Sequence, residues 1–351
     1  MISTRFKNDS QPLLKLNNIQ LAAKKEVEMK IQNGKYTFEN ISCPVCNSIK
    51  TELLSEKDRY GLDFHVVVCL GCGLIYTNPR MTQKSYNEFY DQEYRKLYNG
   101  DESPTELFFK DQYNTGKRIY AFINDALPGM DFKGRNILEI GCGAGGILLY
   151  FKEQRCNVKG YDLGNEYLQF GKNNYGLDLT CGSLKNVPEE YKPDIVIFSH
   201  VLEHLVDFNS ELHKLKEICT PETLLYIEVP GVKDIHDQYR MDSLLYFQNA
   251  HTFHFTLSSL TNLFVKNGFK LIIGTEYVKS IFSLDSNPIN NKEIKNEYPE
   301  IVNYLKNIEK KRFLYLFKIS TINNRIKSLI VCALRRVKLL EPLQKLKERY
   351  L

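Results

Sequence analysis

The stretch ILEIGCGAGG, residues 137–146, decides the fold of this 351-residue chain. It reads as a short buried strand that runs directly into a glycine-rich turn, and the apolar run after it predicts a helix. Glycines at such a turn let the backbone approach a ligand closely, and the start of the helix presents free N–H groups. A glycine turn alone is weak evidence, so the residues around it must show what it binds.

Short apolar strands alternate with helical stretches from Pro128 to about residue 277. This alternation is typical of an α/β sheet. The expected strands are 136–140, 157–162, 177–181, 194–199, 223–229 and 270–277. The predicted fold class is therefore α/β, with a Rossmann-like sheet as the main body of the chain.

Two carboxylates next to the glycine turn indicate the ligand. Asp162 ends the second expected strand, 21 residues after Gly141. In dinucleotide folds a carboxylate at this spacing accepts hydrogen bonds from the ribose of a bound nucleoside. Glu139 lies two residues before Gly141, where it would repel the pyrophosphate of NAD but can hold the ammonium group of S-adenosylmethionine. These residues favour S-adenosylmethionine over NAD.

A family resemblance is carried by four stretches and one carboxylate: ILEIGCGAGG, Asp162, PDIVIFSHVLEHL, LLYIEVPG and HTFHFTLSSLTNLFVKNGF. In order and spacing they closely resemble the class I S-adenosylmethionine-dependent methyltransferases, over about residues 130–277. The resemblance implies an enzyme that transfers a methyl group. It also implies a cofactor site, with Glu139, Gly141, Gly143 and Gly145 at the methionine end, Asp162 and Leu163 at the ribose, Ser183 and Leu184 at the adenine, and Ser199 and His200 beneath the cofactor.

Several histidines fall where the methyl acceptor should lie. Methyl transfer from a sulfonium needs mainly an in-line geometry, but a hydroxyl acceptor also needs a base. The stretch QNAHTFHF, residues 248–255, resembles the acceptor-side loop of the family. We expect His251 to be the general base or to orient the acceptor, with His254 as the second candidate and His200 as the third.

The stretch SHVLEHL, residues 199–205, leaves two interpretations open. On a helix its spacing would place His200, Glu203 and His204 on one face. It resembles SEVVEHV of the ubiquinone-type O-methyltransferases, where the corresponding positions are associated with a divalent metal. A divalent metal at Glu203 and His204 is one interpretation, and helix capping with hydrogen bonds to a neighbouring loop is the other.

Four cysteines in two pairs predict a structural zinc site. Cys43 and Cys46 are separated by 22 residues from Cys69 and Cys72, the spacing of two knuckles that meet in a tetrahedral zinc–thiolate site. Four sulfur ligands leave no open position for water, so the zinc should be structural. The segment resembles the amino-terminal zinc-binding module of methyltransferases in sugar and surface-polysaccharide pathways. This resemblance predicts O-methylation of a sugar, nucleotide sugar or polysaccharide precursor.

Other functions remain alternatives: an RNA methyltransferase with a zinc finger, a sugar C-methyltransferase, or an assembly protein that binds S-adenosylmethionine without turnover. Residues 36–80 contain four Lys or Arg and five Asp or Glu, so their net charge is −1. Binding to nucleic acid requires a positive surface, and the charge of this segment argues against a nucleic-acid partner. A small-molecule or glycan acceptor is the expected partner, and the sequence gives no oligomeric state.

The chain divides by pattern into five segments: a polar lead-in (1–35), the four-cysteine zinc-binding module (36–80), a helical connector (81–129), the methyltransferase domain (130–280) and a helical, basic extension (281–351). Residues 310–351 carry a net charge of +10 within a chain whose total is +5. This tail could pack on the main domain or lie on an anionic membrane. The sequence lacks an apolar run of membrane-spanning length and an amino-terminal signal, which predicts a cytoplasmic protein, peripheral at the inner membrane face if the tail binds lipid.

Overall fold

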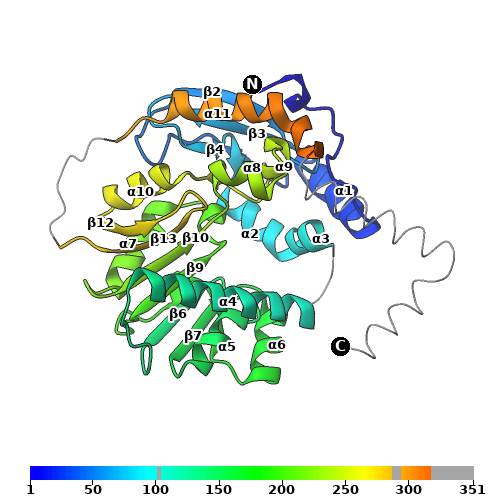
Figure 1. Ribbon diagram of the computed structural model, residues 1–351. Coiled ribbons are helices and arrows are strands. Elements are labelled where there is room, and N and C mark those ends of the chain that lie inside the picture. The colour runs from blue at the N-terminus through cyan, green and yellow to red at the C-terminus, as the bar shows by residue number, and fades with distance from the viewer. Residues whose placement is uncertain (101–103, 287–293, 318–351) are drawn as a thin grey trace.

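A mixed seven-stranded sheet forms the centre of the computed structural model, which describes residues 1–100, 104–286 and 294–317 (Figure 1). The strands are β6 (Asn136–Ile140), β7 (Asn157–Asp162), β8 (Leu179–Cys181), β9 (Ile195–Ser199), β10 (Leu224–Glu228), β12 (Phe269–Gly274) and β13 (Lys279–Leu284). Their order is β12-β13-β10-β9-β6-β7-β8, and β13 alone pairs antiparallel with its neighbours. The order reverses between β6 and β9, the point where open α/β sheets bind ligands. The predicted α/β class is confirmed.

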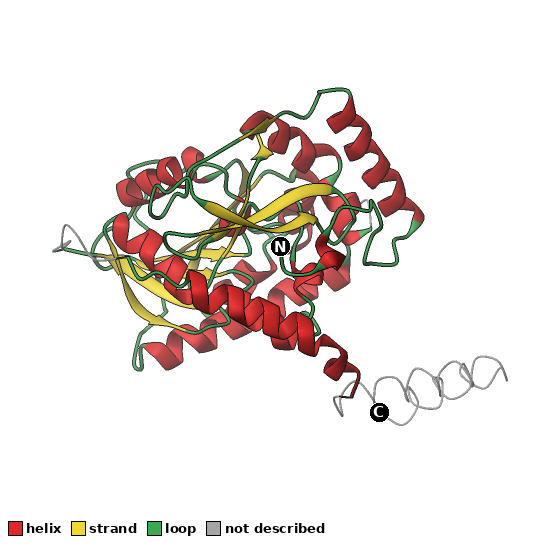
Figure 2. Cartoon of the chain, turned by 90° about the horizontal axis from the view of Figure 1, so that it is seen from above, coloured by secondary structure: helices red, strands yellow, loops and turns green. Residues whose placement is uncertain are grey.

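The central strands bury both faces, which explains their continuous apolar sequences. Successive side chains of β6 point to opposite faces, so Ile137 joins one hydrophobic core and Leu138 the other. Helices α4 (Glu106–Ala126), α5 (Gly146–Glu153) and α6 (Asn165–Tyr175) cover the face of Ile137, while α7 (Phe208–Ile218) and α10 (Leu257–Lys266) cover the face of Leu138. Figure 2 shows the same layers from above.

The sequence pattern missed one strand of this sheet. The last expected strand, 270–277, corresponds to β12, which already ends at Gly274. The chain then turns at Val278, whose φ of 45° is unusual for a β-branched residue, and returns as β13. β13 contains two buried serines, Ser280 and Ser283, and the polarity of its sequence KSIFSL hides a strand that is buried over four residues.

The amino-terminal Cys segment forms a second sheet that includes a strand from the main domain. The segment contributes β2 (Thr51–Lys57), β3 (Asp63–Cys69) and β4 (Ile75–Thr77) to this sheet, while β1 (Phe38–Glu39) and β5 (Arg80–Met81) pair with each other in a separate two-stranded sheet. The four-stranded sheet has the order β11-β4-β3-β2, and β11 (Phe253–His254) comes from far along the chain. The Cys segment is therefore joined to the loop that carries the predicted acceptor histidines.

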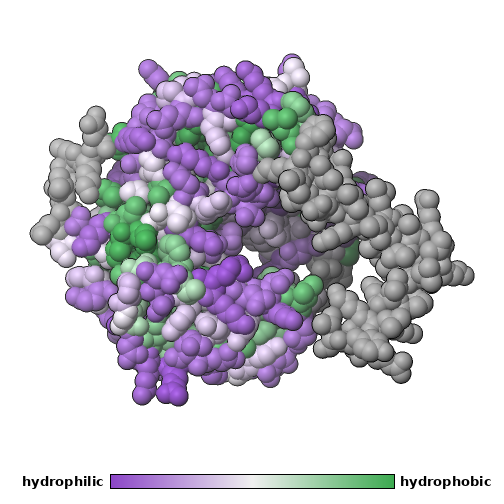
Figure 3. All heavy atoms as spheres, viewed as in Figure 1, coloured by the Kyte–Doolittle hydropathy of each residue, from purple (hydrophilic) through white to green (hydrophobic). Residues whose placement is uncertain are grey.

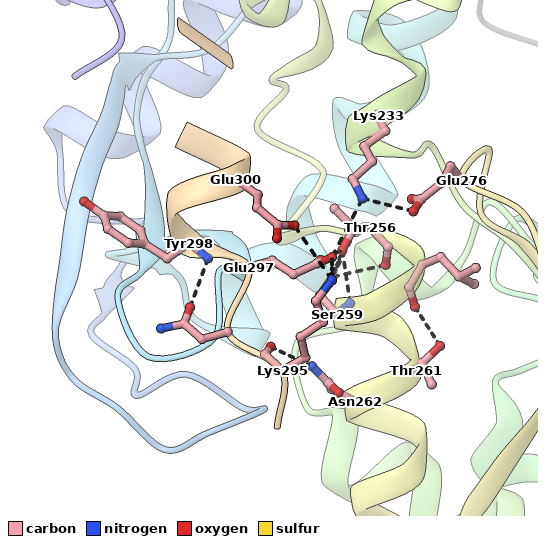
Figure 4. A network of polar contacts seen from close by, with 12 residues as sticks. Lys233, Thr256, Ser259, Thr261, Asn262, Glu276, Lys295, Glu297, Tyr298 and Glu300 are labelled. Carbon is pink, nitrogen blue, oxygen red and sulfur yellow. Dashed lines mark hydrogen bonds and ion pairs between the residues drawn. The ribbon is translucent and has the colours of Figure 1, made fainter. Parts of the chain in front are cut away.

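Helix α11 (Tyr298–Lys311) and the residues before it close the seam between the two sheets. The Glu297 backbone N–H donates to Cys72 O at 3.3 Å, and its buried carboxylate accepts a 2.7 Å hydrogen bond from Thr256 at the start of α10. Lys295 and Lys233 lie 3.3 and 3.7 Å from the same carboxylate (Figure 4). This one residue, through its backbone N–H and its carboxylate, thus connects the Cys segment, the main domain and the start of α11.

Three helices lie beside the Cys segment: α1 (Asn18–Gln32), α2 (Gln83–Gln92) and α3 (Tyr94–Asn99). A buried ion pair of 2.6 Å between Lys30 and Glu93 joins α1 to the α2–α3 junction. The remaining short elements are η1 (Thr4–Phe6), η2 (Leu184–Asn186), η3 (Leu202–His204), η4 (Val232–Asp234), α8 (Ile235–Gln238), α9 (Ser243–Tyr246) and η5 (Arg312–Phe317). The division of the chain into five segments stays a prediction.

The described part of the basic extension ends with η5, and the rest of the predicted basic tail, residues 318–351, lies outside the described residues. Among the described helices, none is both long enough and apolar enough to cross a lipid bilayer. Figure 3 shows the surface hollowed between the upper part of the molecule and the lower part that contains α4 to α6.

Candidate functional site

The glycine turn connects β6 to α5 in a backbone conformation that other residues rarely adopt. Gly141, Gly143 and Gly145 have φ angles of 73°, 54° and 79°. A Cβ atom at Gly141 would lie 2.4 Å from a Val201 methyl carbon, so glycine is also required by space. The turn brings the backbone to the carboxyl edge of the sheet, next to the ends of β7 and β9.

Glu139 on β6 is a buried carboxylate without a partner. Its side chain is 1% exposed, and Oε2 has no hydrogen bond within the described parts of the chain. Burial, together with the charge of Asp162, raises the pKa of Glu139 well above its ordinary value. An orphaned carboxylate at this edge fits a ligand ammonium group, which would supply the missing donor and counter-charge.

Asp162 at the end of β7 is held in place by backbone groups. Oδ2 accepts a 2.9 Å hydrogen bond from Gly143 N, and Oδ1 accepts one of 2.6 Å from Gly164 N. Arg95 of α3 lies 3.3 Å from Oδ1 and stacks on the ring of Tyr167 at 3.6 Å. The carboxylate is thus fixed beside the glycine turn, with Arg95 over it.

The predicted adenine end is the more open part of the edge. Leu184, assigned to the adenine, is buried beneath the surface, whereas Leu163 at the neighbouring ribose position is 67% exposed. The Ser183 hydroxyl accepts a hydrogen bond from Lys185 N and caps η2, so it is engaged locally. Ser199 ends β9, and the next residue, His200, adopts a φ of 57° and is half exposed.

Three histidines surround the carboxylate of Glu203. Its Oε1 lies 3.5 Å from His200 Nδ1, 3.9 Å from His204 Nε2 and 3.9 Å from His251 Nε2. Glu203 is 1% exposed, and neither of its carboxylate oxygens has a hydrogen-bond partner among the described residues. The α-helix expected here is wrong, because only the short η3 forms, yet the three side chains of SHVLEHL still converge.

His251 reaches this cluster from the loop before β11. Burial lowers the pKa of His251 well below its ordinary value, and the nearby His204, His254 and Arg59 lower it further. Burial also lowers the pKa of His204. His204 Nδ1 lies 3.0 Å from Ala250 O, which as an acceptor places the proton on Nδ1 and turns the Nε2 lone pair towards Glu203. Both rings are therefore neutral near pH 7.

His254, the second predicted base, is set back from the cluster. It lies on β11, 2% exposed, with aromatic neighbours Tyr246 and Phe247 at 5.0 and 5.3 Å between ring centroids. Burial lowers the pKa of His254 to about 3. Its ring centroid lies 5.9 Å from that of His251, so it packs behind the residue that contacts Glu203.

The four cysteines come together as the sequence predicts. Sγ of Cys43 lies 3.4 Å from Sγ of Cys72, and Cys46 and Cys69 are separated by the same distance. All four sulfurs lie within 4.8 Å of one another. Tetrahedral zinc with bonds of about 2.3 Å needs sulfurs roughly 3.8 Å apart, so the set fits zinc.

Sequence reasoning did not single out three residues that complete this region: Arg59, Arg95 and Gln248. Gln248 opens the QNAHTFHF stretch, and its place three residues before His251 was a usable signal. Arg59 and Arg95 carry no local signal, since their partners are distant along the chain.

Part of the chain is similar to known proteins. Residues 112–272 match the family described as "Methyltransferase domain". A ubiquinone biosynthesis O-methyltransferase of Bartonella tribocorum is 27% identical over 133 residues, which are 36% of this chain and 51% of that protein. The chain thus spans about half the length of this curated relative.

Solved structures of methyltransferases are also similar in part. The magnesium protoporphyrin IX methyltransferase of Synechocystis is 15% identical with a TM-score of 0.38, covering 58% of this chain and 98% of that one. An amino pentose methyltransferase of Micromonospora echinaspora is 17% identical with a TM-score of 0.30, covering 37% and 58%. The strand order of the central sheet and the match over residues 112–272 together show that this part of the chain has the Rossmann-like fold of a methyltransferase domain.

Proposed function

We propose that this protein transfers a methyl group from S-adenosylmethionine to a hydroxyl group of a sugar, nucleotide sugar or polysaccharide precursor. The observation that carries the proposal is Glu139, a buried carboxylate with an oxygen that no described residue satisfies, at the start of the glycine turn. A cationic amino group of a ligand would satisfy it. Asp162, fixed 2.9 Å from Gly143 N, supports a nucleoside at the same edge.

S-adenosylmethionine supplies an electrophilic methyl group on a sulfonium, so the protein needs mainly to position the acceptor and remove its proton. Glu139, Gly141, Gly143 and Gly145 would hold the methionine end, and Asp162 with Leu163 the ribose. Ser183 and Leu184 would border the adenine, and Ser199 and His200 would lie beneath the cofactor. These assignments follow the family resemblance.

The cluster around Glu203 supports a hydroxyl acceptor. His251 is neutral and lies 3.9 Å from Glu203 Oε1, so a proton taken by its ring would be stabilised by the carboxylate. His200 and His254 remain the other candidates for the base. The similarity to a curated O-methyltransferase also favours oxygen as the accepting atom.

A divalent metal at the same cluster is the alternative use of these residues. Glu203, His204 and His251 offer one ligand atom each within 4.8 Å of one another. His204 is oriented through Nδ1 by the Ala250 carbonyl, an arrangement that metal-binding histidines share. A bound cation would polarise the acceptor oxygen and lower its pKa.

Zinc bound by Cys43, Cys46, Cys69 and Cys72 would be structural in this proposal. Three of the four cysteines are buried, and four thiolate ligands would fill the tetrahedral coordination of zinc, so that no position is left for water or substrate. The site would fix the β2–β3–β4 sheet, and with it β11 and the histidine loop. A cytoplasmic location, with peripheral membrane contact through the tail, stays part of the proposal.

The alternatives make different predictions. An RNA methyltransferase should bind RNA with a steep dependence on salt. A sugar C-methyltransferase should place the label on carbon, and an assembly protein should bind S-adenosylmethionine without turnover. Calorimetry with S-adenosylmethionine, followed by transfer of a labelled methyl group to a panel of nucleotide sugars and to RNA, separates the four. Absence of S-adenosylmethionine binding by the folded protein would reject the proposal.

A further inference from the structure

Arg59 is a cation without a counter-ion, in the turn between β2 and β3. Within the described ranges no carboxylate oxygen lies within 4.0 Å of its guanidinium group. Its Nε is buried and has no hydrogen-bond partner. Nη1 reaches Leu245 O only at 3.5 Å, while Nη2 donates to Tyr60 at 3.0 Å and to Gln248 Oε1 at 2.6 Å. The group thus has spare donors and an unbalanced charge.

The neighbouring acid does not neutralise this cation. The Asp58 carboxylate accepts three backbone hydrogen bonds, from Tyr60, Leu62 and Asn249, at distances of 2.9 to 3.0 Å. It is buried and holds the loop through these bonds. Burial raises the pKa of Asp58 and the charge of Arg59 acts to lower it, but the two groups form no ion pair within 4.0 Å. Arg59 itself is flanked by aromatic faces, with the ring centroids of Tyr60 and Tyr98 at 5.0 and 5.3 Å.

Tyr60, Tyr98 and Gln248, which contact Arg59, also line a small hollow together with Tyr94 and Asn249, and this hollow is too narrow for a water molecule in the present structure. The tyrosines come from the Cys segment and from α3, and Gln248 comes from the histidine loop. These shared residues join Arg59 to the part of the chain in which the acceptor is expected.

Gln248 links Arg59 to the histidine cluster. A guanidinium only donates, so Gln248 presents its oxygen to Arg59 and its amide nitrogen to His251 Nε2, which it contacts closely. Arg59 is thus one side chain away from the proposed base.

We propose that Arg59 binds an anionic group, phosphate or carboxylate, of the methyl acceptor. The inference rests on the proposed function and narrows its substrate class to acidic hydroxyl compounds. An anion would supply the missing charge and pair with the fork of N–H groups, which ammonium side chains cannot offer in the same geometry. The anion would also compete with Gln248 Oε1 for the N–H groups of Arg59, and Gln248 would then be free to move its amide away from the lone pair of His251 Nε2.

Calorimetry on the full chain tests this with simple probes: inorganic pyrophosphate and phosphate for one source of the anion, acetate and glycolate for the other. Each is titrated with and without saturating S-adenosylhomocysteine. We expect the wild type to bind at least one class and Arg59→Gln to bind it about tenfold more weakly or not at all. The class that binds identifies the anion.

The matched control is Arg135→Gln, which removes an arginine paired with Asp194 at the opposite end of the sheet and should leave anion binding unchanged. Wild type that binds none of the probes, or Arg59→Gln that binds as well as wild type, overturns the inference. Failure to bind S-adenosylhomocysteine overturns the proposed function instead, because anion binding is measured separately on the unliganded chain. If Arg59→Gln does not fold, Arg59→Lys decides: weaker pyrophosphate or glycolate binding supports the bidentate role, and unchanged affinity overturns it.

Discussion

Two regions of this protein bury carboxylates in opposite ways. At the seam between the sheets, Glu297 is 2% exposed and is satisfied by Thr256 at 2.7 Å and by two lysines within 3.7 Å. At the ligand edge of the main sheet, Glu139 and Glu203 are each 1% exposed, and three of their four oxygens have no hydrogen-bond partner in the described chain.

Whether a buried carboxylate has hydrogen-bond partners indicates whether its role is structural or functional. A satisfied buried carboxylate stabilises the elements that supply its donors. An unsatisfied one destabilises the free protein, and it is tolerated where a ligand, substrate or metal completes it. Removing Glu297 should therefore reduce stability, whereas removing Glu139 or Glu203 should reduce binding or turnover and leave stability intact.

The largest expected effect is on turnover in Glu203→Gln. Loss of the charge that stabilises a protonated His251 should lower kcat by about 10³-fold, within the range of acid–base effects. Thermal stability should be equal or higher, because the carboxylate has no hydrogen bond to lose. Steady-state kinetics and a thermal melt measure the two quantities.

Glu217→Gln is the control, since it changes a carboxylate of α7 that pairs with Lys214 at the surface. If kcat of Glu203→Gln falls by less than fivefold, Glu203 has no part in the reaction. Assays with and without a chelator that leaves the cysteine-bound zinc in place separate the two uses of the cluster. Loss of activity that is restored by added Mg²⁺ or Mn²⁺ would favour the metal.

The next largest effect is on stability in Glu297→Ala. The change leaves the Thr256 hydroxyl and two lysines without their shared partner, so the free energy of unfolding should fall by about 2–3 kcal/mol. Urea denaturation measures it. Affinity for S-adenosylmethionine should stay within twofold of the wild type, because the seam lies away from the glycine turn.

Glu300→Ala tests whether the loss is specific to the buried position. Glu300 lies on the same helix, is 60% exposed and contacts Lys295 at 3.8 Å, so its removal should change stability by less than about 0.5 kcal/mol. If both variants lose the same free energy of unfolding, the buried position of Glu297 has no special role in stabilising the seam.

Glu139→Gln should weaken S-adenosylmethionine binding by roughly 10- to 100-fold, the value of one charge-assisted hydrogen bond. The amide keeps the shape of the side chain and removes its charge, so the melting temperature should not fall. Calorimetry gives the affinity. Unchanged affinity would mean that the ammonium group of the ligand is held elsewhere, and the main support for the proposed function would be lost.

The sequence predicted the strands of the sheet and the residues near the glycine turn better than it predicted the contacts between distant segments of the chain. Glu139, Asp162 and the glycines follow from local order, because a strand, a tight turn and the next strand fix their relative positions. The cysteine site follows in the same way from spacing. Pairing between distant segments carries no such signal, so β11 joining β4 and Arg59 reaching Gln248 were not foreseen.

Strand β13 and the fold of SHVLEHL show two other limits. β13 buries Ser280 and Ser283, which polarity alone assigns to a loop. In SHVLEHL the spacing i, i+3, i+4 would place three side chains on one face of a helix, but His200 takes a left-handed conformation and only the short η3 forms. The histidines nevertheless meet Glu203, since tertiary contacts from the loop at 248–255 hold them.

The smallest effect is a dependence of stability on pH that comes from the unsatisfied carboxylate of Glu139. Burial, together with Asp162, raises the pKa of Glu139 above its ordinary value of 4.5. The folded protein then holds this proton more tightly than the unfolded chain does. The stabilisation from this group is complete below pH 4.5 and is lost as the pH rises through the raised pKa.

Wild type and Glu139→Gln should therefore diverge with pH. In urea denaturation from about pH 5 to 9, the free energy of unfolding of wild type should fall relative to that of the variant as the pH rises, because the variant has no proton to release. Saturating S-adenosylmethionine should reverse the trend for wild type alone, since its ammonium group stabilises the ionised carboxylate. Parallel curves without ligand would mean that Glu139 is already satisfied, and the contrast with Glu297 would disappear.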